Sequence, residues 1–456
     1  MAKFPFFKGN LSDLDLISCY ASIMSRINVY LGEPKVLTFR FKKYKPTLKD
    51  ALKLIENENA PSDGWFVRVS GKLEKAINSL VLSDLRFTPK KDLLQEKYGL
   101  NINRKSINQF NAEKTAKKQA VSTILLKEIK FGLINDEIIS ALKLLPNEWY
   151  EEYLNLSVDT IVYYPGDLIV DTLEEYLETI DCYGDEPEKE ELNQDKKALV
   201  TETQHYKNNV VLRFPIKDYW TQLKQARARL KKAKDPSQTV YKLVQNSGFG
   251  AFACLYLAIN NPITSNIIPA MARVGCWTML YAKNGFSPIT DGTCFSWGNI
   301  PIGKTFRGIL EENPEYIFNF DPSIESGLDP SKFTQAWIDT EYKNHLANFY
   351  ELSPDHPLIN RFGFELKEES FITKEGNEKL EKWISEIDYT PTDREKNWFL
   401  SENKGFVSTV FFNTYINTNG ANYVKGLSDS SILIDGYEFD FISQTNNIKA
   451  RSYSSK

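Results

Sequence analysis

Two aspartates, Asp15 and Asp291, lie at the ends of short apolar stretches that are typical of β-strands. The stretches read LDLIS around Asp15 and SPITDG around Asp291. Carboxylates that converge from adjacent strand ends commonly hold hard divalent cations such as Mg2+. Two such ions would activate a hydroxyl nucleophile and stabilise a departing pyrophosphate. A single aspartate at a strand end is more often a turn former or a helix cap, so the interpretation depends on the surrounding sequence.

Three cationic side chains form a second candidate group. Arg227 and Lys231 are four residues apart and therefore share one face of the basic helix predicted over 217–235. Lys242 follows on the next predicted helix, after a short turn that should bring the two helices antiparallel. Cations that converge on one groove suit a triphosphate, whose oxygens each need a charged donor. The alternative is a solvated amphipathic face, which is the usual meaning of a charge run.

The segment YKLVQNSGFGAFA at 241–253 begins as an amphipathic helix and then places two glycines, Gly248 and Gly250, around Phe249. We expect the helix to lose its regularity there. One explanation is an ordinary glycine cap at the end of a helix. The other is a surface shaped for a nucleotide, where a glycine lets the backbone approach the ligand closely.

The composition is that of a globular protein of 456 residues, with 42% hydrophobic and 25% charged residues, enough for two or three domains. Five scattered cysteines without a CxxC pair argue against a disulfide framework or a structural zinc site and favour a reducing compartment. With only three histidines, an enzyme would have to rely on carboxylates and lysines. Neither a signal peptide nor an apolar run of ~18 residues is present, so we expect a soluble, intracellular protein without a membrane partner. The net charge of −4 does not exclude a polyanionic partner, since binding depends on a local basic patch.

Strand and helix patterns place these residues on regular elements. The segment 10–27 reads as a strand, a turn and a helix, and 286–297 reads as two strands joined by a tight turn. An apolar helix is predicted over 263–285, and 408–427 reads as a second hairpin with an Asn-Gly turn. The charged run at 185–197 predicts a solvated loop or linker.

The order of these segments resembles that of the motifs of family B DNA polymerases. KLVQNSGFG at 242–250 fits motif B, K-x3-N-S-x-(Y/F)-G, and the preceding RLKKAKDPSQTVYKLVQ resembles the fingers sequence that leads into it. DLISCYAS at 15–22 resembles motif A, D-x-x-S-L-Y-P-S, with Cys19 in place of Leu and Ala21 in place of Pro.

Two further segments extend the resemblance. ITDGTCF at 289–295 resembles motif C, D-T-D-S-x-x, with Ile289 at the first Asp and Gly292 at the Ser. NTY at 413–415 resembles the template-primer motif K-x-Y, with Asn413 at the Lys. A second stretch, DTIVYYPG from Asp159, also places Tyr and Pro at motif A offsets but lacks the Ser, so we prefer Asp15.

The resemblance implies an α+β fold with a polymerase palm, in which helices cover an antiparallel sheet, and with helical fingers. The palm would come from three segments, 1–30, 261–300 and 406–456, and the last of these would also hold a reduced or vestigial thumb. The fingers would span 209–260. Two large insertion subdomains would separate these parts, at 31–208 and 301–405.

The resemblance also implies roles in catalysis. Asp15 and Asp291 would be the palm carboxylates that bind two Mg2+ ions, with Mn2+ as a substitute. Lys242 would contact the triphosphate of an incoming deoxynucleotide, assisted by Arg227 and Lys231.

Five further residues would contact the substrates. Tyr20 would stack under the incoming sugar and exclude a 2′-hydroxyl group, so that deoxynucleotides are chosen. Asn246, Phe249 and Gly250 would line the nascent base pair. Tyr415 would touch the primer strand of the primer-template DNA.

The sequence departs from the family at three places. Ile289 replaces the first motif C Asp, although Asp291 fills the position that is chiefly needed for metals. Only 14 residues precede Asp15, so we expect no 3′–5′ exonuclease domain. Proofreading would then come from a separate exonuclease or replication subunit as a further partner, or it would be absent. About 30 residues follow the hairpin at 408–427, too few for a full thumb. Abundant Lys, Asn and Ile are typical of an AT-rich coding source such as a phage, a plasmid or an organelle.

Two functions follow from these observations. The first is a template-directed DNA polymerase that extends a primer with dNTPs. The alternative is a non-catalytic relative that binds DNA or serves as a scaffold subunit in a replication complex. A decayed relative would have no physical reason to keep Asp15 and Asp291 together, because two strand-end carboxylates repel each other without a metal.

Overall fold

The largest sheet of the described chain has nine antiparallel strands. The computed structural model describes residues 6–444, with longer gaps at 86–120, 176–209, 255–259, 298–302 and 315–333 and shorter gaps of one to three residues. The strands follow the order β11-β12-β1-β16-β17-β20-β14-β15, and β13 also pairs with β1. Their bounds are β1 (Phe6–Leu16), β11 (Phe286–Ile289), β12 (Gly292–Ser296), β13 (Phe364–Leu366), β14 (Glu369–Thr373), β15 (Phe406–Thr409), β16 (Phe412–Asn419), β17 (Asn422–Leu427) and β20 (Ser443–Gln444). The predicted α+β class with an antiparallel sheet is therefore confirmed.

Strand β1 carries different side chains on its two faces, because successive residues of a strand point to opposite sides. Leu14 and Leu16 are buried in the main core of the protein. On the other face, Leu11 belongs to an apolar cluster with aromatic residues of neighbouring strands. Asp13 and Asp15 follow Leu11 on that same face. One face of the sheet thus passes from an apolar cluster to a pair of carboxylates.

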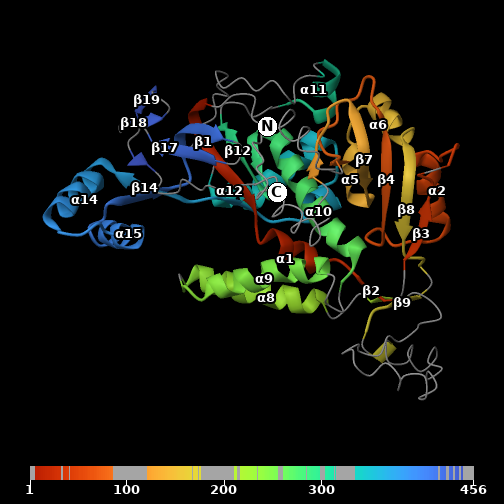
Figure 1. Ribbon diagram of the computed structural model, residues 1–456, viewed down its shortest axis with the longest axis horizontal. Helices are drawn as coiled ribbons and strands as arrows, with labels where there is room; N and C mark the ends of the chain where they lie inside the picture. The colour runs from red at the N-terminus through yellow and green to blue at the C-terminus, as the bar shows by residue number, and fades with distance from the viewer. Residues whose placement is uncertain are drawn as a thin grey trace, which may run out of the picture.

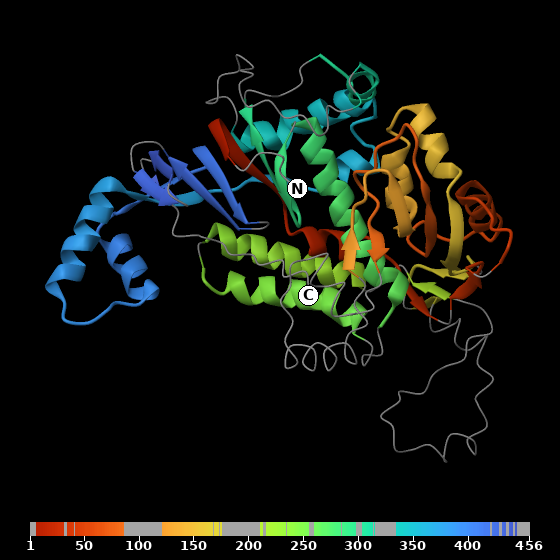
Figure 2. The ribbon, with the colours of Figure 1, turned by 45° about the horizontal axis from the view of Figure 1, so that its top comes forward.

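Helix α10 (Pro262–Ala282) lies at the centre of the molecule, between the nine-stranded sheet and a second sheet (Figures 1 and 2). The side chain of Asn261 caps its first turn by accepting hydrogen bonds from the backbone N–H groups of Ile263 and Thr264. Most residues of α10 are buried, as expected for a helix that is enclosed on all sides.

Two long helices form an antiparallel hairpin below this core. Helices α8 (Ile216–Lys232) and α9 (Gln238–Ala253) contact each other and both contact α1 (Cys19–Met24), the short helix that follows β1 (Figure 1). The basic helix and the antiparallel turn predicted from the sequence are confirmed.

The second sheet has four strands in the order β3-β8-β4-β7 and lies across α10 from the first (Figure 2). Its strands and helices are β3 (Lys35–Thr38), β4 (Trp65–Lys72), β7 (Glu128–Ile134), β8 (Ser157–Tyr163), α2 (Leu48–Asn57), α5 (Asp136–Leu142) and α6 (Asn147–Leu154). Helix α5 packs against α10, and buried residues of this sheet belong to the same core cluster as α10. The segment predicted as an insertion therefore shares its core with the centre of the molecule.

Other elements lie around these layers. Helices α14 (Lys374–Glu386) and α15 (Asp393–Glu402) form a pair at the far edge of the nine-stranded sheet (Figure 1), where the rings of Trp383 and Phe399 stack at 4.7 Å between centroids. The remaining elements are α11 (Phe306–Glu312), α12 (Gln335–Tyr350), α13 (Pro357–Asn360), α14 (Lys374–Glu386), α15 (Asp393–Glu402), β2 (Val29–Leu31), β5 (Ser83–Leu85), β6 (Val121–Thr123), β9 (Leu168–Val170), β10 (Val210–Leu212), β18 (Ser431–Ile434) and β19 (Tyr437–Asp440). No helix in the described part of the chain is long and apolar enough to cross a bilayer.

A lysine at the end of α10 is enclosed by aromatic rings. Lys283 is fully buried, and its Nζ lies 4.4 Å from the ring centroid of Trp337 and 4.8 Å from that of Tyr342. Its ammonium group has no hydrogen-bond partner among the described residues. Burial lowers the pKa of Lys283 well below its usual value of 10.5. Burial and the Lys283 charge lower the pKa of nearby His345 to about 4.

The structure tests the elements predicted around the motifs. The strand-turn-helix at 10–27, the hairpin at 286–297 and the hairpin within 408–427 are present as β1–α1, β11–β12 and β16–β17. The charged run at 185–197 lies outside the described residues. The expected break at the motif B glycines is wrong, because α9 continues to Ala253.

Candidate functional site

Strand pairing brings the two predicted carboxylates to neighbouring positions. In the antiparallel pair β1–β12, Asp15 lies opposite Gly292, the residue that follows Asp291. The backbone N–H of Leu16 donates a hydrogen bond to the carbonyl oxygen of Asp291 at 2.9 Å. Asp291 lies in the two-residue turn between β11 and β12, so a tight hairpin presents it beside the end of β1.

Gly292 leaves the space that the Asp15 side chain occupies. A Cβ atom at position 292 would lie 1.8 Å from Oδ1 of Asp15 and 3.2 Å from the carbonyl oxygen of Leu14. A side chain of any size would therefore displace the carboxylate. The glycine that replaces the motif C Ser thus has a physical role in this geometry.

The carboxylate of Asp15 is in an unfavourable electrostatic environment. Burial, together with the charges of Asp13 and Asp291, raises its pKa from 3.8 to about 6, even though the charge of Lys367 lowers it. A group of carboxylates that raise one another's pKa is stabilised by a cation. A cation bound at Asp15 would therefore relieve this repulsion.

The backbone around these aspartates is strained. Ser18, Ser287 and Thr290 are three of the seven non-glycine residues with positive φ in the described chain. They lie in the two segments that carry Asp15 and Asp291. A β-branched residue such as Thr290 rarely adopts φ near its value of 59°. Strain of this kind often accompanies functional sites, so it supports this location.

A buried ion cluster beside Asp15 was missed in the sequence. Asp13 accepts hydrogen bonds from Nζ of Lys425 and, at 2.7 Å, from the thiol of Cys294. Lys425 also donates to Oε1 of Glu369 at 2.8 Å. Nζ of Lys367 lies 3.7 Å from Asp13, 3.7 Å from Glu369 and 3.9 Å from Asp15.

The cluster holds Asp13 ionised. Burial alone would raise the pKa of Asp13, but the charges of Lys425 and Lys367 outweigh it and lower the pKa to about 2. The alternating sequence SDLDL was a signal for Asp13, since it places that residue on the same strand face as Asp15. No local signal marked the two lysines, because they come from distant strands and loops.

The helical hairpin contacts the end of β1 directly. Nη1 of Arg227 donates hydrogen bonds to Oγ of Ser18 at 2.9 Å and to Oε1 of Gln245 at 3.3 Å. Nζ of Lys231 donates to Oε2 of Glu365 at 2.5 Å, and Glu365 lies opposite Asp15 in the β1–β13 pair. These contacts bring α8 over the candidate carboxylates.

Tyr20 and Phe249 meet between α1 and α9. Their ring centroids are 5.1 Å apart with an interplanar angle of 41°. Arg273 of α10 is partly buried near Tyr20, and its burial lowers its pKa to about 10. The predicted sugar contact and one predicted base-pair contact are therefore adjacent, with a cation beside them that the sequence did not indicate.

Helix α9 runs through its two glycines without a break, and the structure gives a packing reason for Gly248. A Cβ atom at Gly248 would lie 2.1 Å from the ring of Trp220 on α8, so glycine is needed for the two helices to approach. At Gly250, no atom would lie within 4 Å of a Cβ atom. Because the helix is continuous, Lys242, Asn246 and Phe249 follow one another on a single stripe. Lys242 and Asn246 are exposed on it.

Tyr415 and Asp159 both lie in the interior of the protein. Tyr415 is fully buried, and its hydroxyl group shares a hydrogen bond with Ser287. In this structure it is therefore a core residue, and the primer contact stays a prediction. Asp159 lies in the four-stranded sheet, where it pairs with Lys45 at 2.5 Å. This ion pair accounts for its burial away from Asp15.

Asp15 and Asp291 suit a magnesium ion in type and position. Mg2+ is usually bound through one or two carboxylates together with waters and substrate phosphates. In the described ranges, no group of three or more His, Cys, Asp and Glu side chains is arranged to hold a metal. Two adjacent carboxylates would therefore need substrate oxygens to complete the coordination.

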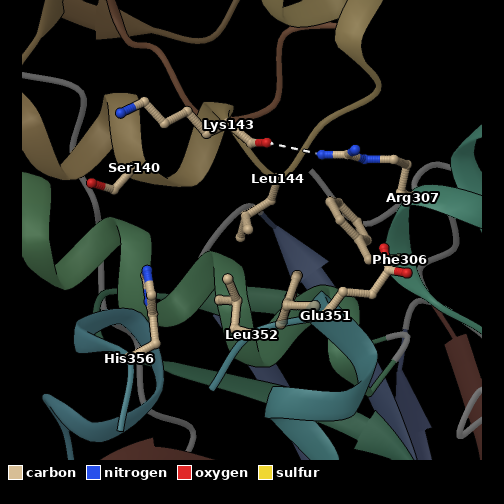
Figure 3. A pocket seen from close by; sticks show the side chains of 9 residues that line it. Ser140, Lys143, Leu144, Phe306, Arg307, Glu351, Leu352 and His356 are labelled. Carbon is tan, nitrogen blue, oxygen red and sulfur yellow. Dashed lines mark hydrogen bonds between the residues drawn. The ribbon is translucent and has the colours of Figure 1, made fainter. Parts of the chain in front are cut away.

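A pocket of about 380 Å3 lies elsewhere, between α5, α11 and the segment after α12 (Figure 3). Arg307 on its wall donates a hydrogen bond to the backbone oxygen of Lys143 at 3.2 Å. No residue that lines this pocket belongs to the group around Asp15. We therefore place the candidate site at the end of β1.

Comparisons with known proteins do not extend this description. No protein-family model matches the chain, and searches of curated proteins and of solved structures give no significant match.

Proposed function

We propose that the protein is a template-directed DNA polymerase, which extends a primer with dNTPs by two-metal-ion nucleotidyl transfer. The observation that carries the proposal is the position of Asp15 beside Asp291 on an antiparallel sheet, next to a basic helical hairpin. The order of the polymerase-like motifs in the sequence supports the same function.

Asp15 and Asp291 would hold the metal ions through their carboxylate oxygens. Mg2+ bound there would activate the primer 3′-hydroxyl group and stabilise the leaving pyrophosphate. The turn between β11 and β12 and the notch at Gly292 would hold the two carboxylates in place before substrate arrives. Such preorganisation lowers the reorganisation needed during reaction.

The helical hairpin would bind the triphosphate. Arg227 is already anchored on Ser18, next to the segment that carries Asp15. Lys231 would exchange its contact with Glu365 for a phosphate oxygen, and exposed Lys242 would add a third donor. Exposed lysines and an anchored arginine together suit a substrate that arrives and leaves in each cycle.

Tyr20 and Phe249 would bound the space for the sugar and the new base pair. Their contact at 5.1 Å places an aromatic floor between α1 and α9. The ring of Tyr20 would exclude a 2′-hydroxyl group by its volume, while exposed Asn246 would lie one helical turn from Phe249.

A second function is a non-catalytic, DNA-binding scaffold related to polymerases. The observation that favours it is Ile289, which replaces a motif C Asp and packs against the apolar cluster around Phe286. A chain that kept only its DNA-binding surfaces would tolerate this change.

Primer extension separates the two functions. We expect wild-type protein with Mg2+ to extend a primer, and Asp15→Asn and Asp291→Asn to lose at least ~10³-fold in rate, equivalent to about 4 kcal/mol of transition-state stabilisation. Asp388→Asn, at an exposed position on the α14–α15 side, is the matched control. Extension by both site variants at the wild-type rate would remove the metal assignment. Binding of primer-template DNA without extension by any protein would support the scaffold.

A further inference from the structure

We propose that Lys367 is a built-in counter-cation of the candidate metal site: it orients Asp15 in the metal-free protein and weakens the binding of the first divalent cation. The inference rests on the proposed metal site at Asp15 and Asp291. It assigns a positioning role to a residue of the loop between β13 and β14, which the sequence motifs do not include.

Lys367 is held by its backbone next to the carboxylates. Its N–H donates a hydrogen bond to the carbonyl oxygen of Asp13 at 3.0 Å. Its Nζ is 3.7 Å from Oδ2 of Asp13, 3.9 Å from Oδ2 of Asp15 and 3.7 Å from Oε1 of Glu369. The ammonium group therefore lies among three carboxylates at nearly equal distances of 3.7 to 3.9 Å.

Lys425 has a different role in the same cluster. It is 1% exposed and donates short hydrogen bonds to Asp13 and Glu369, which tie β17 to β1 and β14. The side chain of Lys367 is 22% exposed, and its contacts are longer. Lys425 is thus a fixed structural ion, whereas Lys367 can shift toward Asp13 and Glu369 or away from them.

The charges of the cluster match one divalent cation. Its carboxylates are Asp13, Asp15, Asp291 and Glu369. Lys367 and Lys425 compensate two of these four charges, so a net charge of −2 remains. Loss of the Lys367 charge would leave −3, which would attract a divalent cation more strongly at these short distances.

Movement of Lys367 would link metal binding at Asp15 to the contacts that Lys367 makes with Asp13 and Glu369. When Asp15 binds a cation, the repulsion between that cation and the Lys367 ammonium favours a shift of Lys367 toward Glu369. When the site is metal-free, Lys367 neutralises Asp15 and keeps its carboxylate beside Gly292. A substitution that removes the charge should therefore strengthen metal binding and weaken the metal-free fold together.

Titration with Mn2+, followed by the electron paramagnetic resonance signal of the free ion, tests the inference without reference to activity. We expect Lys367→Gln and Lys367→Met to bind Mn2+ at least about tenfold more tightly than wild type, and Lys367→Arg to bind within about threefold of it. Without metal, the Gln and Met variants should unfold at lower temperature, and Mn2+ should stabilise them more than wild type. Lys304→Gln, which removes an exposed lysine paired with Glu312, controls for net charge.

The outcomes separate this inference from the proposed function. In one outcome, wild type binds Mn2+, Asp15→Asn does not, and the Lys367 variants bind it as wild type does or more weakly. This result overturns the role of Lys367 and leaves the metal site intact. Absence of Mn2+ binding by wild type overturns both. If Lys367 has a purely structural role, its substitution would lower the unfolding temperature without any gain in Mn2+ affinity. Lys367→Met is suited to this comparison because it retains much of the aliphatic stem.

Discussion

Substitution of Gly292 by alanine tests the geometry of the candidate site most directly. The new Cβ atom would lie 1.8 Å from Oδ1 and 3.0 Å from Cγ of Asp15, well inside the usual contact distance. The carboxylate can relieve this overlap by rotating out of its position; otherwise strand β1 must shift. The new Cβ atom cannot move away on the other side, because it would already lie 3.2 Å from the carbonyl oxygen of Leu14. Overpacking of this kind costs about 1–3 kcal/mol.

We expect Gly292→Ala to bind Mn2+ at least about tenfold more weakly, because ~1.4 kcal/mol of strain on the bound geometry is a factor of ten in affinity. Primer extension should fall by at least as much. Gly292→Ser, which restores the residue of the polymerase motif, should give the same loss, whereas reasoning from the motif alone predicts none. The measurements are Mn2+ titration and primer extension, with circular dichroism to confirm folding.

Gly285→Ala is the matched control for this substitution. Its Cβ atom would meet Oγ1 of Thr293 at 2.7 Å and the carbonyl oxygen of Cys294 at 2.9 Å, so it overpacks the same hairpin without touching Asp15. We expect lower stability with unchanged Mn2+ affinity. If Gly292→Ala bound Mn2+ as wild type does, or if both alanines weakened binding equally, the notch beside Asp15 would not have the role that we assign to it.

Four further substitutions test the fold around the site. Lys283→Met should raise the free energy of unfolding by about 1–3 kcal/mol at pH 7, because it removes a buried charge, and the gain should shrink toward pH 10. A destabilised variant would show that the attraction between the ammonium group and the aromatic rings exceeds the cost of burying the charge. The pKa of His345 is about 4 in the folded protein and near 6.5 unfolded, so stability should fall by about 3 kcal/mol as pH decreases from 6.5 to 4, and His345→Gln should flatten that urea-unfolding profile. Gly248→Ala should lower the unfolding temperature through its overlap with Trp220, equivalent to about 1–3 kcal/mol, and an unchanged temperature would contradict that contact. Asp15→Asn should stabilise the metal-free protein by about 1–3 kcal/mol in urea unfolding at pH 7.5, since it removes a desolvated charge; destabilisation would mean that the contact with Lys367 dominates.

Local signals in the sequence were sufficient for the elements that carry the aspartates. The hairpin at 286–297 was predictable because apolar strand residues flank a short polar turn, and the β1–α1 unit because alternation gives way to a helical pattern. Which strands pair is not a local property. The neighbourhood of Asp15 and Asp291 was therefore predicted only through the resemblance to polymerase motifs.

The motif B glycines show how a local signal can have a distant cause. Glycine at 248 indicated a helix end, since glycine is common at C-caps and costs about 1 kcal/mol inside a helix. In the structure the absent side chain accommodates Trp220, which comes from another helix. The sequence shows that a side chain is missing, but it does not show what fills the space.

The lysines of the ion cluster mark a second limit. Lys367 and Lys425 are more than 350 residues from Asp13 in the chain, and neither belongs to a motif or a charge run. The pairing of β13 with β1 brings Lys367, which follows β13, beside Asp13, and the strand order β1-β16-β17 brings Lys425 to the same cluster. Tyr415 shows the opposite case, in which a local motif suggested a DNA contact. In the structure, Tyr415 lies on a strand face that packs into the core.

The cost of keeping this arrangement favours the polymerase over the scaffold. Raising the pKa of Asp15 from 3.8 to about 6 corresponds to about 3 kcal/mol of destabilisation, and positive φ at Thr290 adds about 1–3 kcal/mol. Together these are a large share of the 5–15 kcal/mol by which a typical domain is stable. The fold needs neither, since asparagine at 15 would pair in β1 equally well and glycine or asparagine at 290 would close the turn without strain. DNA binding through the α8–α9 hairpin would need neither, whereas the proposed cation site at Asp15 and Asp291 would account for both.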